Sequence, residues 1–214
     1  MIINIMGGGP AKLIPPLSSF LGPEDRWVGV DRGTAELIDR GIEPYAAFGD
    51  FDSVTEEQLV LFKASIRNLK KVNPEKDETD MELALQWAIN EKPGKIRLFG
   101  ATGGRIDHFL ANLHLMQKFS GVEDSPEIEM IDICNTVLIK PPGTYRLEKE
   151  AKKYISFLPG TGEVSGLTLK GFKYPLENRH IPAGSTLCIS NELIGDNGTF
   201  SFSKGILIII RSDD

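Results

Sequence analysis

Short apolar runs alternate with helix-like stretches over the first 133 residues, and most of the runs end in glycine or aspartate. The strand-like runs are residues 2–6, 26–30, 45–48, 95–99 and 127–133, and the helix-like stretches are residues 34–40, 55–65, 79–90 and 106–119. In the last of these stretches, Leu110, Leu113 and Met116 recur at the spacing of a buried helix face. Alternation of this kind favours a mostly parallel sheet with flanking helices. The sequence therefore predicts an α/β domain in the N-terminal part of the chain.

The pattern changes beyond residue 135, where short strand-like runs follow one another between proline and glycine turns. We expect these strands at residues 144–147, 154–158, 167–174, 185–190, 199–203 and 206–211. Short strands at this spacing indicate an antiparallel sandwich. Residues 160–162, Gly-Thr-Gly, are interpreted as a hairpin turn because no helix follows them. We therefore predict two domains, an α/β domain over residues 1–135 and an all-β sandwich over residues 136–214.

The composition excludes several classes of protein. The chain has 214 residues, of which 41% are hydrophobic, and a net charge of -6. This acidic balance lacks the basic footprint of a nucleic-acid-binding protein, and it disfavours an anionic membrane surface. Cys134 and Cys188 show no metal-ligand spacing, which favours two buried thiols in a reducing compartment. The N-terminal residues do not resemble a signal peptide, and no apolar run is long enough to span a membrane, so we expect a cytoplasmic protein.

Acidic residues follow several of the predicted strands. Asp31, Asp50, Asp52 and Asp107 lie at or just beyond strand ends, and Asp80 lies in the first turn of a predicted helix. In an open parallel sheet, ligands bind beyond the carboxyl ends of the strands, so we expect these carboxylates on one edge of the domain. Such a cluster is self-repulsive unless a cation offsets its charge. Mg²⁺ shared with substrate phosphates suits this donor set, and phosphoryl chemistry would follow.

Structural roles compete with this interpretation of the same residues. A lone aspartate at a strand end is often a turn or cap residue, and Asp80 favours a helix N-terminus whatever its function. Thr79 and Glu82 fit a capping box, and Asp50 to Ser53 could cap the helix expected after them. The glycines at positions 7–9 could approach a phosphate or could only turn the chain.

An ordered set of segments resembles the thiamine pyrophosphokinase family, and its bacterial members in particular. The segments are VDRG (30–33), GDFDS (49–53), DETDMELAL (77–85), GATGGRIDHFLANL (100–113), GLTLKGFKYPL (166–176) and SNE (190–192). They cover most of the chain in family order. The resemblance implies a Mg²⁺-dependent enzyme that transfers pyrophosphate from ATP to the hydroxyl of thiamine, giving thiamine diphosphate and AMP. It also implies an N-terminal catalytic domain, a C-terminal thiamine-binding β-sandwich, and a homodimer with active sites at the subunit interface.

The resemblance also implies roles for individual residues. Asp50, Asp52 and Asp80 would be catalytic and would bind Mg²⁺, and Asp107 would join them as a fourth catalytic residue. The residues that would bind ATP and its phosphates are Asp31, Thr79, Arg105 and Asp107. The residues that would bind thiamine are Thr168, Tyr174, Ser190 and Asn191. Asp80 and Asp107 are the two candidates for the group that accepts the hydroxyl proton.

Two residues depart from the family pattern. Tyr174 stands where some members have tryptophan, which keeps an aromatic face, and Arg32 stands where a small residue is expected. Two other functions stay open on the residues alone. A Mg²⁺-dependent phosphotransferase acting on another alcohol would release ADP in place of AMP, and a silent thiamine or nucleotide binder would show no turnover. A bare interaction module does not explain five acidic residues at one edge.

Overall fold

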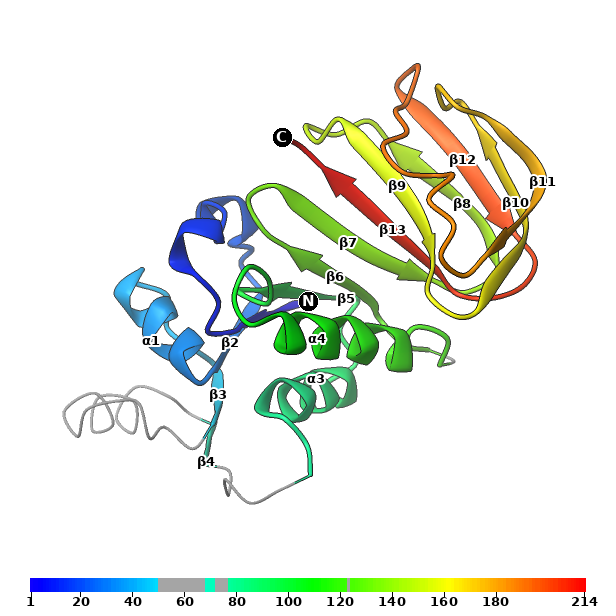
Figure 1. Cartoon of the computed structure of the whole chain (residues 1–214). Helices are drawn as coiled ribbons and strands as arrows, with labels where there is room; N and C mark the ends of the chain where they lie inside the picture. Colours follow the sequence, from blue (N-terminus) through cyan, green and yellow to red (C-terminus); the bar gives the residue numbers. More distant parts are fainter. Residues whose placement is uncertain (50–67, 72–76, 123) are drawn as a thin grey trace. The chain divides into compact units, whose positions relative to one another are not determined.

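The structure is a computed structural model that describes residues 1–49, 68–71, 77–122 and 124–214 (Figure 1). The helix expected at 55–65 and the residues Asp50 and Asp52 lie outside these described residues. The chain divides into two compact units, the first of residues 1–115 and 124–133 and the second of residues 116–123 and 134–214. Within the described ranges, no helix has both the length and the apolar character needed to cross a membrane.

The first unit contains parallel strands in the order β4-β3-β2-β1-β5-β6. Their bounds are β1 Ile2–Met6, β2 Arg26–Val30, β3 Ala46–Gly49, β4 Asn68–Lys71, β5 Lys95–Phe99 and β6 Glu127–Ile131. In the central strands, Ile5 pairs with Val28 on one side and with Leu98 on the other, and all three side chains are fully buried. The predicted parallel arrangement is thus present. It agrees with the continuous apolar character of these runs, because parallel strands are buried on both faces.

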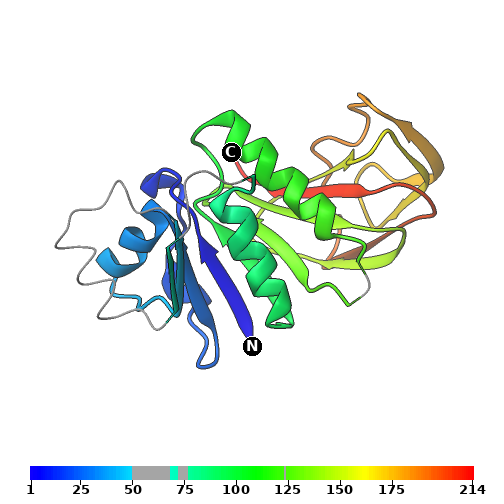
Figure 2. The same ribbon diagram turned by 90° about the horizontal axis from the view of Figure 1, so that it is seen from below.

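Helices cover both faces of these strands. Helix α3 (Asp80–Asn90) contacts β1, β2 and β3, and its Trp87 ring lies 5.9 Å from that of Phe48. Figure 2 shows α3 and the first part of α4 (Ile106–Phe119) side by side, as does Figure 1. On the opposite face lie α1 (Arg32–Asp39) and the short helices η1 (Ala11–Leu13) and η2 (Leu17–Phe20). Leu37 of α1, Leu17 of η2 and Ile14, which follows η1, pack in a cluster around Trp27 and Phe99.

The buried face of α4 differs from the predicted one. Leu110 is 46% exposed, so the prediction that it faces the core is wrong. Met116 is fully buried, as predicted, and the other buried side chains of α4 are those of Asn112 and Leu115, so the buried face is rotated away from Leu110. Asn112 is buried because its amide nitrogen donates to the carbonyl oxygen of Ala101, at 3.3 Å. A buried polar side chain thus occupies a position on the buried face that the apolar pattern does not predict.

The second unit contains two groups of antiparallel strands, in the orders β7-β13-β9 and β11-β10-β12-β8. Their bounds are β7 Asn135–Lys140, β8 Gly143–Glu148, β9 Tyr154–Pro159, β10 Glu163–Lys170, β11 Leu176–Pro182, β12 Asn197–Phe202 and β13 Leu207–Ser212. Phe157 and Ile209 from the first group pack in one core with Leu167 and Phe200 from the second. Two sheets that share one core form a sandwich.

Several local predictions in this unit are wrong. Residues 185–190 form turns rather than a strand, and Ser190 has a left-handed φ of 56° that no strand residue adopts. Residues 160–162 do not close a hairpin, because β9 and β10 on either side of them belong to different groups of strands. Strand β11 was not expected, because most of its side chains are exposed and its sequence is polar. Strand β10 begins before the expected residue 167 and ends before Gly171, whose φ is 81°.

Candidate functional site

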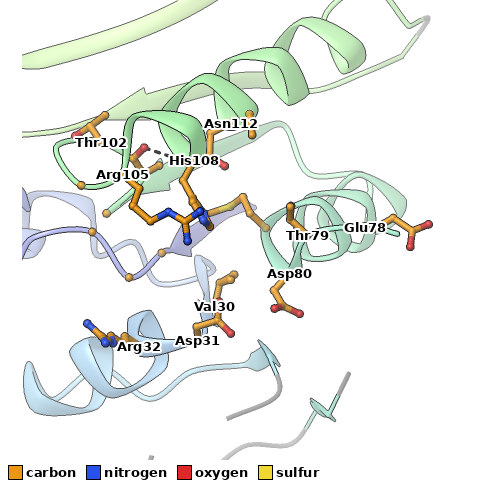
Figure 3. A pocket seen from close by; sticks show the side chains of 18 residues that line it. Val30, Asp31, Arg32, Glu78, Thr79, Asp80, Thr102, Arg105, His108 and Asn112 are labelled. Atoms are coloured by element: carbon orange, nitrogen blue, oxygen red, sulfur yellow. Dashed lines mark hydrogen bonds between the residues drawn. The ribbon is translucent and has the colours of Figure 1, made fainter. Parts of the chain in front are cut away.

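A pocket of about 770 Å³ lies at the carboxyl ends of β1, β2 and β5 in the first unit (Figure 3). Two glycine-containing loops line it, residues 7–9 after β1 and residues 100–104 after β5. Its charged side chains include Asp31, Asp80 and Arg105. The pocket therefore lies where an open parallel sheet places its ligands.

The two glycine loops interlock. The Gly9 nitrogen donates to the carbonyl oxygen of Gly100 at 2.8 Å, and a Cβ added to Gly9 would lie 2.5 Å from that oxygen. Gly100 has a φ of 59°, and a Cβ there would lie 2.3 Å from the carbonyl oxygen of Gly7. Close packing of the two loops therefore requires glycine at these positions, whatever the pocket binds.

Asp31 joins β2 to α1 in a strained conformation. Its φ is 50° and its ψ is -123°, a region that non-glycine residues seldom occupy and that typically stores about 1–3 kcal/mol. Its nitrogen donates to the carbonyl oxygen of Phe48 at 2.9 Å. A Cβ added to Gly49 would lie 2.5 Å from the Asp31 Oδ1 atom. The Asp31 carboxylate thus lies beside Gly49, which ends β3. Asp50 is the next residue in the chain after Gly49.

Thr79 and Asp80 begin helix α3. The Thr79 hydroxyl accepts a hydrogen bond from the nitrogen of Glu82 at 3.2 Å, so the predicted N-cap is confirmed. Both residues line the pocket, and Figure 3 shows the Asp80 carboxylate directed away from the axis of α3. Asp31 and Asp80 supply the hard oxygen donors that Mg²⁺ prefers. Within the described ranges, no group of three or more acidic, histidine or cysteine residues could hold a metal.

Arg105 and Asp107 form a forked ion pair at the start of α4. The Arg105 Nε atom donates to Asp107 Oδ1 at 3.1 Å, its Nη2 atom donates to Oδ2, and the His108 nitrogen also donates to Oδ1. These donors stabilise the charged carboxylate, the Arg105 hydrogen bond most, and lower the pKa of Asp107 to about 2. Arg105 lines the pocket, whereas Asp107 is not among the described lining residues.

Replacement of Arg105 is expected to release Asp107. In an Arg105→Gln variant, the pKa of Asp107 should rise from about 2 toward its ordinary value of 3.8, because the strongest donor is lost. A depressed pKa means that the pair stabilises the fold above about pH 4 and that this contribution fades as the pH falls through 2. Carboxyl chemical shifts followed by NMR from pH 1.5 to 6 measure the change. An unchanged Asp107 titration in the variant would contradict the pairing.

The residues expected to bind thiamine lie in the second unit. Asn191 is 2% exposed, and its side chain holds the backbone of Tyr174 at both ends. Asn191 Oδ1 accepts from the Tyr174 nitrogen at 3.0 Å, and its Nδ2 donates to the Tyr174 carbonyl oxygen at 2.8 Å. The Tyr174 side chain is 57% exposed. The structure therefore brings Tyr174 next to Asn191 and its neighbour Ser190, whose nitrogen donates to the Ser156 hydroxyl at 3.0 Å.

Thr168 lies on β10, and the hydrogen bond described for its side chain is not to Tyr174, Ser190 or Asn191. Its hydroxyl oxygen accepts from the nitrogen of Asn178 in β11, at 3.0 Å. In the first unit, the pocket is also lined by polar and charged residues for which the sequence predicts no role. These are Arg32, Glu78, Thr102, His108 and Asn112. All five fall within the segments 30–33, 77–85 and 100–113, whose motifs therefore carried a usable signal.

Comparison with known proteins identifies both units. A sequence profile described as "Thiamin pyrophosphokinase, catalytic domain" matches residues 17–130, and one described as "Thiamin pyrophosphokinase, vitamin B1 binding domain" matches residues 144–207. The thiamine pyrophosphokinase of Bacillus subtilis (strain 168) is 53% identical over 213 residues, covering 99% of each chain. Thiamin pyrophosphokinase 1 of Caenorhabditis elegans is 25% identical over 87% of this chain and 79% of its own.

Solved structures agree with this assignment. The crystal structure of the Bacillus subtilis thiamine pyrophosphokinase superposes with a TM-score of 0.93 at 52% identity, covering 100% of both chains. That of the Geobacillus thermodenitrificans thiamin pyrophosphokinase has a TM-score of 0.91 at 50% identity, covering 100% of this chain and 98% of that one. With both profiles matched in order and a relative 53% identical over 99% of both chains, the chain belongs to the thiamine pyrophosphokinase family of enzymes.

Proposed function

We propose that the protein transfers the pyrophosphoryl group of ATP to the hydroxyl of thiamine, giving thiamine diphosphate and AMP in a Mg²⁺-dependent reaction. The observation that carries the proposal is the pocket in the first unit. It combines the carboxylates of Asp31 and Asp80 with the guanidinium of Arg105 and two glycine loops, in a chain of this family. These are the groups that a metal-bound polyphosphate requires.

Each part of the pocket has a role in this proposal. Asp80 would hold the Mg²⁺ together with Asp50 and Asp52, and Asp31 would support the same cluster from the end of β2. When bound, the ion would offset phosphate charge and draw electrons from the reacting phosphorus. Arg105 would bind phosphate oxygens from the side of α4, and the glycine loops would let the backbone approach the phosphates.

The proposed transfer needs no reactant other than ATP and thiamine. The thiamine hydroxyl oxygen attacks the β-phosphorus in line, a new oxygen–phosphorus bond forms, and the bond from that phosphorus to the bridging oxygen of AMP breaks. The hydroxyl proton passes to a carboxylate. The pKa of about 2 makes Asp107 a weak base while Arg105 pairs with it. Asp80 would be weakened as a base in the same way while it held the Mg²⁺, so both residues stay candidates for the acceptor.

We also propose that the second unit binds thiamine and that the protein is a cytoplasmic homodimer with its active sites at the subunit interface. Thiamine is an aromatic cation, and the exposed ring of Tyr174 beside Asn191 provides a face on which it could stack.

The dimer proposal is supported by the family resemblance, which implies that the partner subunit contributes residues to each active site. Light scattering should report twice the chain mass of 23.6 kDa, and a mass near that of one chain at micromolar concentration would contradict the dimer.

Product analysis tests the proposed reaction. The protein is incubated with ATP, Mg²⁺ and thiamine, and nucleotides and thiamine esters are resolved by chromatography. We expect thiamine diphosphate and AMP in equal amounts, and loss of both when a chelator removes the Mg²⁺. ADP with thiamine monophosphate would instead indicate an ordinary phosphotransferase. Thiamine binding by calorimetry with no product would indicate a binding protein.

Loss of the Tyr174 ring is expected to weaken thiamine binding. A Tyr174→Ala variant should bind thiamine about 1–2 kcal/mol more weakly, the scale of a lost stacking contact with a cation. Tyr174→Trp is the matched control, because it keeps an aromatic face on a backbone that Asn191 holds in place. Isothermal titration calorimetry measures both affinities. Equal thiamine affinity in the alanine variant and the parent protein would show that thiamine does not stack on Tyr174.

A further inference from the structure

Asp132 is a buried carboxylate close to the pocket but not among its described lining residues. It follows β6 and is 5% exposed. Burial of a charged group is costly unless hydrogen bonds compensate it. The Asp132 Oδ2 atom accepts a hydrogen bond from the hydroxyl of Thr102 at 2.8 Å. Thr102 lies in the glycine-containing loop 100–104 that lines the pocket. A buried group behind the pocket is therefore bonded to the loop that forms its wall.

The same loop is held at two further points. The Asn112 amide nitrogen donates to the carbonyl oxygen of Ala101 at 3.3 Å, and Asn112 is 8% exposed. Gly103 packs directly on Leu13, because a Cβ added there would overlap the leucine side chain. The nitrogen of Ile133, next to Asp132, donates to the carbonyl oxygen of Leu13 at 2.9 Å. The end of β6 thus supports both Thr102 and the residue on which Gly103 rests.

The loop needs such support because of its own composition. Gly100 and Gly103 have φ values of 59° and 73°, and a glycine-rich backbone loses more conformational freedom on ordering than any other. Arg105 follows the loop directly and has a side chain 73% exposed, so its own burial does not fix its position. The location of its guanidinium therefore depends on its ion pair with Asp107 and on how firmly the preceding residues are held.

We propose that Asp132 is a positioning residue. Through the Thr102 hydroxyl it fixes the loop 100–104, and through the loop it fixes the position of Arg105 in the pocket. This inference rests on the proposed function, because it assigns Arg105 and the loop to the phosphates of ATP. A hydrogen bond to a charged, buried carboxylate is among the stronger ones in proteins, so its loss should be measurable in nucleotide binding.

A double-mutant cycle tests the proposal. Asp132→Ala, Thr102→Val and the double variant are compared with the parent protein for kcat and for the KM values of ATP and thiamine. Each single variant should raise the KM for ATP about tenfold and leave the KM for thiamine within twofold. The double variant should be no worse than Asp132→Ala alone, because both changes remove one interaction. Thr102→Ser, which keeps the donor, should restore most of the ATP affinity.

Several outcomes would overturn the proposal. A fall in kcat with both KM values unchanged would mean that the pair only supports folding. Additive effects in the double variant would mean that the two side chains act separately. If Asp132→Ala does not fold, Thr102→Val against Thr102→Ser still decides whether the donor matters. Calorimetry with Mg²⁺ and a non-hydrolysable ATP analogue measures the same change without turnover, so a failure of the proposed reaction is distinguishable from a failure of the positioning role.

Discussion

Asp80→Asn should lower kcat by on the order of 10²-fold or more, because the substitution removes a carboxylate that we place on the phosphate-bound cation. Asp80 lines the pocket at the first residue of α3. Asparagine keeps the size and the helix-initiating position but loses the charge. The Mg²⁺ concentration required for half-maximal rate should also rise, which a merely structural effect on α3 would not cause.

Glu82→Gln is the matched control for this prediction. Glu82 lies in the same first turn of α3, but it is not among the described residues that line the pocket. The kcat of the Glu82→Gln variant should stay within about threefold of that of the parent protein, since loss of a charge near a helix N-terminus costs less than about 1 kcal/mol. Steady-state kinetics over a Mg²⁺ titration, with circular dichroism to confirm folding, measure both variants. A kcat of Asp80→Asn close to that of the Glu82→Gln control would show that Asp80 is not a catalytic residue.

Gly33→Ala should destabilise the protein by about 3 kcal/mol, because there is no room for a methyl group at this position. Gly33 lies in the first turn of α1, and its Cβ would come within 1.9 Å of the carbonyl oxygen of Met6. That oxygen belongs to the backbone at the end of β1, so it cannot move aside as a flexible side chain could. Either α1 or the end of β1 must shift, and both carry residues of the pocket.

Gly195→Ala provides the comparison, because a Cβ at Gly195 would meet no atom within 4 Å. Its stability should differ from the parent by less than about 1 kcal/mol, the range of entropic effects in the unfolded chain. Urea unfolding followed by far-UV circular dichroism, which reports on both units, measures both free energies. Equal unfolding midpoints for the two variants would show that α1 can move away from β1 at little cost.

The elements that the sequence predicted well are those whose signals are local. The buried runs of β1, β2 and β5 and the Thr79 cap need no information from distant residues. Asp31 and Asp80 were predicted to come together because parallel strands place their carboxyl ends at one edge. The pocket brings these two residues together as its lining.

The misses share a dependence on distant partners. Leu110 is exposed, whereas Asn112 is buried and donates to the Ala101 carbonyl oxygen, a contact that no helical pattern reveals. The apolar residues among 185–190 suggested a strand, but the left-handed Ser190 bends the chain there. The contact of Asp132 with Thr102 joins residues 30 positions apart, so the motif that contains Thr102 gives no indication of its partner.

The chain passes from the first compact unit to the second at residue 116, returns at residue 124, and leaves again at residue 134. The last turn of α4 therefore folds with the β-sandwich, where Gln117 Nε2 donates to the carbonyl oxygen of Gly160 at 2.9 Å. A fragment that starts at residue 134 would lack this turn and its hydrogen bond to Gly160. Expression of the second unit alone thus calls for a linker that replaces residues 124–133, and expression of the first unit for one that replaces residues 116–123, since no single cleavage point separates the two.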